Sequence, residues 1–353
     1  MMERIIERLV ILLKISSPSG EEHKIAKVIK EMVENWGYSV IQDEIGNLFI
    51  SSNKVPKLFL NAHMDTVTPC DNVNPIIDGD IIKSDGNTVL GADDKVGLAV
   101  ILELLENYKD DPLPIQVIFT VQEEVGLIGA KAIKRNMIKA PCGFTLDAGG
   151  PVGNVIIGAP SQYTWTYKIY GVAAHAGAYP ERGVNAIQLA SKLILSLPIG
   201  RINDITTGNI GIISGGRATN IIPDEVEIRG EYRSRDEGYL QVLLNNLEKA
   251  SSIVEEGGGK TRLEYRKEYT RFDLKDSEFL KRTIDAIKNS GFNPNTVYMG
   301  GGSDANIFNE QGIPTLLLGI SGSEAHSTRE YAKISEIKDG YRLIESVVKI
   351  LTQ

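Results

Sequence analysis

Hydrophobic and polar positions follow two different patterns along this chain. In its first part the apolar runs that suggest strands are continuous, as in Ile115 to Val121 and Gly143 to Leu146. Continuous runs are typical of strands that are covered on both faces of a parallel sheet. Apolar residues at helical spacing stand between them, as in residues 3–14 and Val96 to Leu105. This pattern predicts an α/β fold with a mostly parallel central sheet flanked by helices.

Apolar and polar residues alternate instead between residues 162 and 271. Alternation is typical of antiparallel strands with one face in solvent. The predicted order is strand, helix, strand, strand, helix, strand, as in a ferredoxin-like α+β domain, over residues 163–171, 183–197, 206–213, 225–235, 238–255 and 262–269. The first pattern returns afterwards. We therefore expect a discontinuous domain built from 1–161 and 272–353, with an inserted α+β domain at 162–271.

Composition narrows the classes of protein that the chain can belong to. With 353 residues, 42% hydrophobic and 24% charged, it has the profile of a globular protein of two domains. Its net charge of −8, without any Lys/Arg cluster, argues against a nucleic-acid partner. No apolar stretch approaches the roughly 18 to 20 residues of a membrane span, so no membrane partner is expected. Cys70 and Cys142 lack metal or redox spacing, which fits a cytoplasmic protein.

Chemically active side chains follow the predicted strands of the first pattern. His63 and Asp65 come after the apolar run 58–60, and side chains two apart on an extended segment share a face. Glu123 and Glu124 follow the run that ends at Val121, and Asp147 follows Leu146. In open α/β sheets the sites lie beyond the carboxyl ends of the strands. We therefore expect these residues to meet at one edge of the sheet.

Two further groups complete a candidate metal site. Asp93 and Asp94 begin a predicted helix, where aspartate is also a common cap, and His326 stands in a late loop. The candidate ligands are two imidazoles and three carboxylates: His63, Asp93, Glu124, Asp147 and His326. This mixture suits zinc, and also manganese or cobalt. Five ligands are too many for one catalytic zinc but suit two metals that share a carboxylate. Glu123, beside a ligand, is then the candidate general base.

Taken together, these residues resemble the M20 clan of co-catalytic zinc peptidases, and within it the peptidase T-like (tripeptide aminopeptidase) branch. The resemblance covers nearly the whole chain, and the ordered set of motifs is far more specific than any one of them. The motifs are Ser-Pro-Ser-Gly-Glu-Glu at 17–22, His63-Met64-Asp65, Gly91-Ala92-Asp93-Asp94-Lys95, Glu123-Glu124, Leu146-Asp147, Ala174-His175-Ala176-Gly177, residues 217–223, 233–236 and 300–308, and His326.

The resemblance implies a role for each candidate residue of the metal site. His63, Asp93 and Asp147 would hold one metal, and Asp93, Glu124 and His326 the other. Asp93 would bridge the two ions in preference to Asp94, because the bridging aspartate of the family directly follows a small residue. Asp65 would orient His63. Glu123 would take a proton from a water that bridges the metals and give it to the leaving amine.

The inserted domain also acquires roles through the resemblance. His175 would stabilise the oxyanion, often in the site of a partner subunit, which implies a homodimer formed through the inserted domain. Asn220 and Arg233 would contact the substrate, with Arg233 binding a C-terminal carboxylate. Many family members have histidine where this chain has Arg235, which leaves open which arginine binds. The loop from Gly300 to Ser303 is expected to line the pocket, since glycine lets the backbone approach a peptide closely.

These roles predict an enzyme that removes the N-terminal residue from short peptides, with two divalent metal ions, Zn²⁺ first among them, as cofactors. A dipeptidase, a carboxypeptidase and an N-acyl-amino-acid amidohydrolase of the same fold are the alternatives. A non-catalytic metal-binding protein is a further alternative. Glu123 argues against that last reading, because a binding protein has no use for a glutamate that is not a ligand beside one that is.

Overall fold

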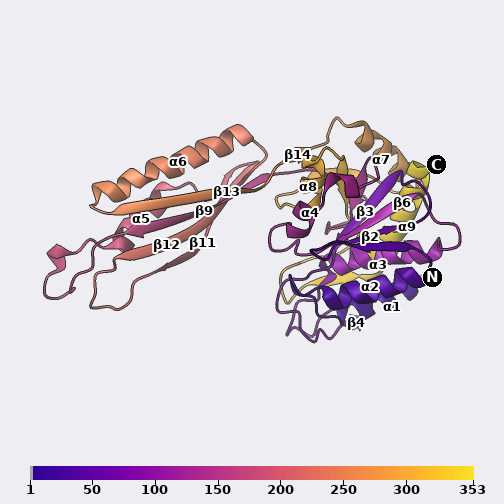
Figure 1. Ribbon diagram of the computed structural model, residues 1–353, viewed down its shortest axis with the longest axis horizontal. Helices are drawn as coiled ribbons and strands as arrows, with labels where there is room; N and C mark the ends of the chain where they lie inside the picture. The colour runs from indigo at the N-terminus through magenta and orange to yellow at the C-terminus, as the bar shows by residue number, and fades with distance from the viewer. Residues whose placement is uncertain (1–2) are drawn as a thin grey trace. The chain divides into compact units, whose positions relative to one another are not determined.

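The computed structural model describes residues 3–353, which divide into two compact units. The first contains the chain up to 158 together with 273–299 and 303–353, and the second contains 159–272 with the short loop 300–302 (Figure 1). Where the sequence led us to expect boundaries after 161 and 271, the units divide after 158 and 272. The loop 300–302 groups with the second unit, which the sequence did not indicate.

The first unit is built on a nine-stranded sheet within the described residues. Its strand order is β1-β2-β6-β3-β7-β16-β8-β14, with β15 beside β8. The strands are β1 Ser39–Gln42, β2 Leu48–Ser51, β3 Leu58–His63, β6 Ile115–Thr120, β7 Gly143–Thr145, β8 Asn154–Ala159, β14 Phe272–Asp273, β15 Asn295–Tyr298 and β16 Thr315–Leu318. The four central strands, β6-β3-β7-β16, are all parallel to one another. The expected fold class, a mostly parallel central sheet flanked by helices, is confirmed.

Helices cover both faces of this sheet, as the continuous apolar strands require. The helices of the unit are α1 Arg4–Leu13, α2 His23–Asn35, α3 Ala92–Asn107, α4 Ile128–Ala132, α7 Glu278–Asn289, α8 Asp304–Glu310 and α9 Ile334–Thr352. Leu58 and Leu60 belong to the large core that includes α1, α3 and α9. Phe59 lies between them in sequence and points the other way, into a smaller core, where its ring meets Phe308 edge to face at 5.0 Å. Alternate residues of β3 therefore pack against helices on opposite faces of the sheet.

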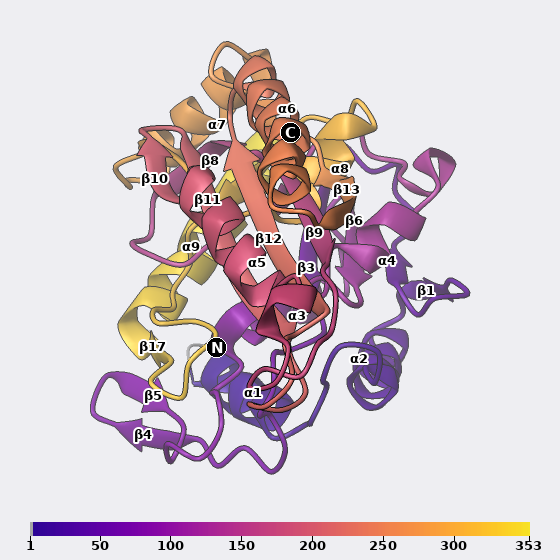
Figure 2. The ribbon, with the colours of Figure 1, turned by 90° about the vertical axis from the view of Figure 1, so that its left-hand side faces the viewer.

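The second unit is a five-stranded antiparallel sheet in the order β10-β11-β12-β9-β13. Its strands are β9 Ser161–Tyr170, β10 Gly200–Asn203, β11 Thr206–Gly215, β12 Glu225–Ser234 and β13 Lys260–Tyr269. Helices α5 (Ala186–Ser196) and α6 (Glu237–Glu256) lie over one face (Figure 2) and share a core with it. Asn185 and Asp236 cap these helices through their side chains. The short strand β10 is an addition to the expected order.

Some short elements carry too little pattern to be predicted. A small sheet in the order β17-β5-β4 joins Tyr331–Lys333, Ile81–Lys83 and Ile76–Asp78. Its β4 and β5 lie between the apolar run 58–60 and the predicted helix Val96 to Leu105, and Ile82 is the one buried residue of the two strands. Over residues 3–353, no helix is long and apolar enough to cross a membrane.

Candidate metal centre

Three neighbouring strands bring the candidate ligands to one edge of the large sheet. His63 is the last residue of β3, which runs parallel to β6 and β7 on either side. Glu123 and Glu124 follow the end of β6, and Asp147 follows the end of β7. Because His63 stands opposite Thr120 in the register, the carboxyl ends of these strands coincide. This is the edge at which open α/β sheets carry their sites.

The two adjacent aspartates at the start of α3 have different surroundings. Asp93 faces the imidazoles of both His63 and His326. Asp94 is buried, and its carboxylate accepts hydrogen bonds from the backbone N–H groups of Gly97 (3.1 Å) and His63 (3.3 Å). Asp94 thus makes the capping contact that an aspartate at a helix start often makes. Of the two aspartates, Asp93 is the one that belongs to both candidate ligand groups.

The five predicted ligands form two groups that have Asp93 in common. His63 Nε2 lies 3.2 Å from Asp93 Oδ1 and 4.0 Å from Asp147 Oδ1. His326 Nε2 lies 3.5 Å from Asp93 Oδ2 and 2.9 Å from Glu124 Oε2. In each group the ligand atoms all lie within 4.8 Å of one another. The two oxygens of Asp93 therefore face different groups, as a bridging carboxylate must.

Glu123 belongs to the same space. It forms a third close group with His63 and Glu124, again with ligand atoms within 4.8 Å of one another. Burial raises the pKa of Glu123 well above its usual range, and the neighbouring charges of Asp304, Glu124 and Asp93 raise it further. A carboxyl group with a raised pKa holds and releases a proton near neutral pH more readily than an ordinary glutamate.

The charge balance of the cluster fits a divalent cation. Burial and the charges of Asp93 and Glu123 raise the pKa of Asp147 well above its usual range. Hydrogen bonds with Asp93 and Glu124 raise the pKa of His326 to about 10, which means that these carboxylates favour positive charge at this position. Glu124 Oε1 is buried and has no hydrogen-bond partner among residues 3–353. An orphaned carboxylate oxygen among paired imidazoles is a suitable ligand set for zinc.

Asp65, which was expected to orient His63, contacts both that histidine and the turn of Glu123 and Glu124. His63 Nδ1 lies 3.0 Å from the main-chain oxygen of Asp65 and 3.4 Å from its carboxylate. A proton on Nδ1 leaves Nε2 free to face Asp93. The Asp65 carboxylate also accepts hydrogen bonds from the backbone N–H groups of Glu123 (3.0 Å) and Glu124 (3.1 Å), and from the hydroxyl of Ser19 (2.7 Å).

Two buried carboxylates near the cluster were not among the predicted site residues. Asp304, at the start of α8, accepts a hydrogen bond from Thr120 Oγ1 at 2.5 Å. Glu330 accepts one from the backbone N–H of Gly91 (2.7 Å) and one from that of Asp93 (3.0 Å). The loop from Gly300 to Ser303 was a usable signal for Asp304, since it was expected to line the pocket and ends directly before this residue. The sequence gives no signal for Glu330, because its hydrogen-bond partners are backbone groups far away in the chain.

The remaining predicted residues lie in the second unit. His175 Nδ1 accepts hydrogen bonds from the N–H groups of Gly177 (3.2 Å) and Ala178 (3.1 Å). The segment of His175 pairs with that of Asn220, because the N–H of Ala176 donates to the Asn220 carbonyl. Arg233 donates through Nε (2.8 Å) and Nη2 (3.1 Å) to the carboxylate of Glu231 on the same strand. The roles predicted for His175, Asn220 and Arg233 remain predictions.

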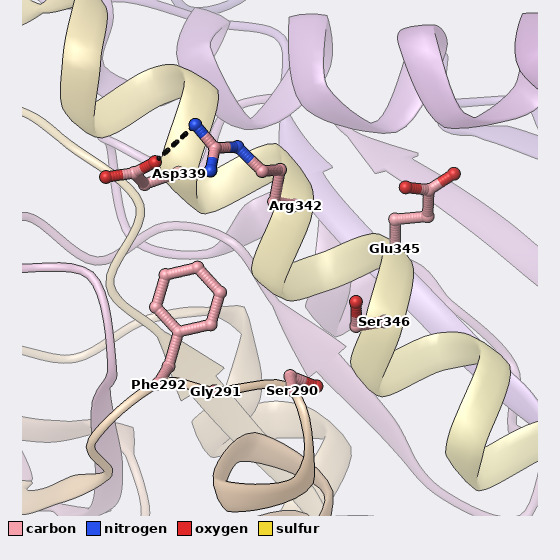
Figure 3. A pocket seen from close by; sticks show the side chains of 7 residues that line it. All are labelled: Ser290, Gly291, Phe292, Asp339, Arg342, Glu345 and Ser346. Atoms are coloured by element: carbon pink, nitrogen blue, oxygen red, sulfur yellow. Dashed lines mark ion pairs between the residues drawn. The ribbon is translucent and has the colours of Figure 1, made fainter.

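A separate pocket of about 470 Å³ in the first unit does not belong to the metal centre. It lies where the turn after α7 faces α9, and Arg342 forms an ion pair with Asp339 (3.1 Å) at its edge (Figure 3). Its lining residues are Ser290, Gly291, Phe292, Asp339, Arg342, Glu345 and Ser346. None of the candidate ligands is among them.

A mostly parallel α/β sheet with two ligand groups that share an aspartate defines the class of metal-dependent hydrolases. Residues 59–350 match the family model for Peptidase family M20/M25/M40, and the chain belongs to this family of peptidases. The resemblance found in the sequence is thereby confirmed.

Relatives of known structure match the chain over its whole length. A tripeptidase from Staphylococcus aureus is 37% identical, with a TM-score of 0.94, over 100% of this chain and 99% of that one. The aminopeptidase PepT from Bacillus cereus is 34% identical, with a TM-score of 0.89 and the same coverage. The uncharacterized protein YqjE of Bacillus subtilis (strain 168) is 36% identical over 98% of both chains. The chain is thus similar to tripeptidases and PepT aminopeptidases throughout.

Proposed function

We propose that this peptidase is an aminopeptidase that removes the N-terminal residue from short peptides, tripeptides first among them, with two divalent metal ions. The observation that carries the proposal is the pair of ligand groups joined by Asp93, with Glu123 beside them. The names of the similar structures, a tripeptidase and an aminopeptidase PepT, support the choice of substrate.

The residues divide the chemistry between them. His63, Asp93 and Asp147 would hold one ion, and Asp93, Glu124 and His326 the other, with Zn²⁺ preferred over Mn²⁺ or Co²⁺ for this mixture of nitrogen and oxygen ligands. When bound, two such ions polarise the carbonyl of the scissile amide and lower the pKa of the attacking water.

Glu123 then acts as the general base and general acid of the reaction. A carboxylate oxygen of Glu123 takes the proton of the attacking water, and the same group delivers it to the nitrogen of the leaving amine. The raised pKa of Glu123 suits both steps, because a group that must accept and then donate a proton works best with a pKa near the operating pH. Asp65 fixes the backbone of Glu123 and the ring of His63 during this cycle.

The second unit, predicted as residues 162–271, is proposed as a lid and dimerisation domain. His175 would donate from Nε2 to the oxyanion, because its Nδ1 already accepts hydrogen bonds from backbone N–H groups. Asn220 would contact the peptide backbone, and Arg233 its C-terminal carboxylate. Glu231 accepts from two of the five N–H donors of Arg233, so the other three would bind the peptide carboxylate. Arg235 is the alternative.

A substrate panel combined with metal analysis tests the proposed function. Free-amine tripeptides, dipeptides and N-acyl amino acids are compared on one preparation, with and without added Zn²⁺, Mn²⁺ or Co²⁺. Tripeptides should be cleaved fastest, at their N-terminal bond, and cleavage should stop with a chelator. Faster cleavage of dipeptides, of C-terminal bonds or of N-acyl amino acids would instead identify a dipeptidase, a carboxypeptidase or an amidohydrolase.

The Glu123→Gln variant tests the proposed base separately. Its kcat should fall by about 10²- to 10⁴-fold, the usual contribution of general acid–base catalysis, while bound metal stays near two ions per chain. Glu21→Gln serves as the matched control because Glu21 is exposed. Full activity of Glu123→Gln would refute the assignment of the base, and two bound ions without any hydrolysis in the unchanged protein would favour a binding protein.

A further inference from the structure

The turn that carries Glu123 and Glu124 is held by an unusual set of hydrogen bonds. Three successive backbone N–H groups donate to buried carboxylates. Those of Glu123 and Glu124 donate to the two oxygens of Asp65, at 3.0 and 3.1 Å, and that of Gln122 donates to Oε1 of Glu22 at 2.9 Å. Asp65 is part of the metal site already described, whereas Glu22 has no role in it so far.

Gln122 needs such a partner because of its backbone conformation. Its φ of 53° lies in the left-handed region, which is strained for residues other than glycine. That conformation aims the N–H groups of the turn at the two carboxylates. Without an acceptor for the Gln122 N–H, the peptide between Val121 and Gln122 would keep only the hydrogen bond that its carbonyl accepts from the N–H of Gly129 (3.0 Å), and the start of the turn would be held less firmly.

Glu22 is well placed to hold the turn. Its side chain is 5% exposed and makes no capping hydrogen bond to α2, although Glu22 stands at the N-cap of that helix. The same Oε1 also accepts the backbone N–H of Gly20 at 2.9 Å. The segment itself is fixed to the end of β3, since the N–H of Thr66 donates to the Ser17 carbonyl at 2.9 Å and the Ser19 hydroxyl donates to Asp65.

We infer that Glu22 is a positioning residue for the base, which it places by fixing the backbone N–H of Gln122. Glu22 neither holds a metal nor moves a proton in this role. The inference rests on the proposed function of Glu123. Its expected size follows from geometry, because a displacement of about 1 Å in a reacting group can lower a rate by about 10²-fold. Within residues 3–353, hydrogen bonds to the Glu22 side chain go to Oε1 alone, so glutamine, which keeps one acceptor oxygen, should replace it.

Two measurements on the full-length protein test this inference. The first is hydrogen exchange of the segment around Gln122 in the metal-free protein, which requires no activity. Exchange there should become faster in Glu22→Ala and Glu22→Met, and remain as it was in Glu22→Gln and in the exposed control Glu21→Ala. Methionine fills the space of glutamate without an acceptor oxygen, so it also reports on the hydrogen bond if the alanine variant does not fold.

The second measurement is tripeptide hydrolysis at saturating metal. Glu22→Ala and Glu22→Met should lower kcat by about 10- to 100-fold, with KM and two bound metal ions retained, and Glu22→Gln should restore kcat to within about threefold. The inference would be overturned if hydrogen exchange and kcat were unchanged in both Glu22→Ala and Glu22→Met. It would also be overturned if kcat fell as far in Glu22→Gln as in Glu22→Ala. If the unchanged protein cleaves no peptide, the proposed function fails, while the exchange experiment still decides whether Glu22 fixes the turn.

Discussion

Replacing Asp304 by asparagine should stabilise the metal-free protein at neutral pH. The carboxylate of Asp304 is 1% exposed; its Oδ2 accepts from Thr120, and its Oδ1 has no partner within the described part of the chain. Burial raises the pKa of this group to about 6, although the hydrogen bond from Thr120 opposes the shift. Asparagine keeps an oxygen for the Thr120 hydroxyl and removes the buried charge.

The size of the effect follows from the shift in pKa. An aspartate has a pKa of 3.8 when unperturbed, so a folded value of about 6 differs by about 2 units. At 1.36 kcal/mol per unit, the ionised form costs the folded state about 3 kcal/mol. The folded protein binds this proton more tightly than the unfolded chain does. The stability that the proton provides is therefore complete below pH 3.8 and is lost as the pH rises through about 6.

Urea unfolding of chelator-treated protein at pH 5 and pH 7.5 measures this loss. Trp36 reports on the first unit if Trp165 of the second unit is replaced by phenylalanine in all variants. The advantage in unfolding free energy of Asp304→Asn should grow by more than about 1 kcal/mol between the two pH values. The exposed Asp111, changed to asparagine, is the control. A stability advantage of Asp304→Asn that does not change with pH would refute the reasoning. Added Zn²⁺ should reduce this advantage, because a nearby cation favours the charged carboxylate of the unchanged protein.

Two other outcomes follow from the contacts of single side chains. Asp65→Asn should weaken metal binding by about 10- to 100-fold, as is usual when a partner of a ligating histidine is lost. Competition with a chromophoric chelator measures the metal affinity. An unchanged affinity would contradict the role given to Asp65. Burial raises the pKa of the Cys142 thiol to about 11 from its ordinary 9.0, so at pH 8 its thiolate fraction is about 100-fold lower. Iodoacetamide should alkylate Cys142 about 100-fold more slowly in the folded protein than in urea, and equal rates would exclude that shift.

Much of the site was predictable because strand patterns are local. Continuous apolar runs indicate parallel strands, and parallel strands bring the residues that follow them to one edge, so that His63, Glu124 and Asp147 could be grouped by their positions in the sequence. The choice of Asp93 over Asp94 came from the family resemblance, because both residues look alike as helix caps. In the structure they differ through contacts with His63, His326 and Gly97.

The contacts of the site that could not be predicted include those in which a carboxylate holds a backbone group. Glu22, Asp65 and Glu330 all accept from main-chain N–H groups that lie far away in sequence. Every residue except proline offers such a donor, so no residue type marks the partner in a sequence. The short strands of the β17-β5-β4 sheet were missed for a related reason, since three residues are too few to show a period.

The two candidate ligand groups draw on different parts of the chain, so they would form at different stages of folding. His63, Asp93 and Asp147 all precede the second unit, so their group is complete in the N-terminal part of the first unit. The other group requires His326, and Glu330 ties the loop of His326 to Asp93 across 237 residues. A cation in that second group closes a very long loop and stabilises only molecules in which both ends of the discontinuous unit have joined. Occupancy of the two groups would thus report on different stages in the assembly of one domain.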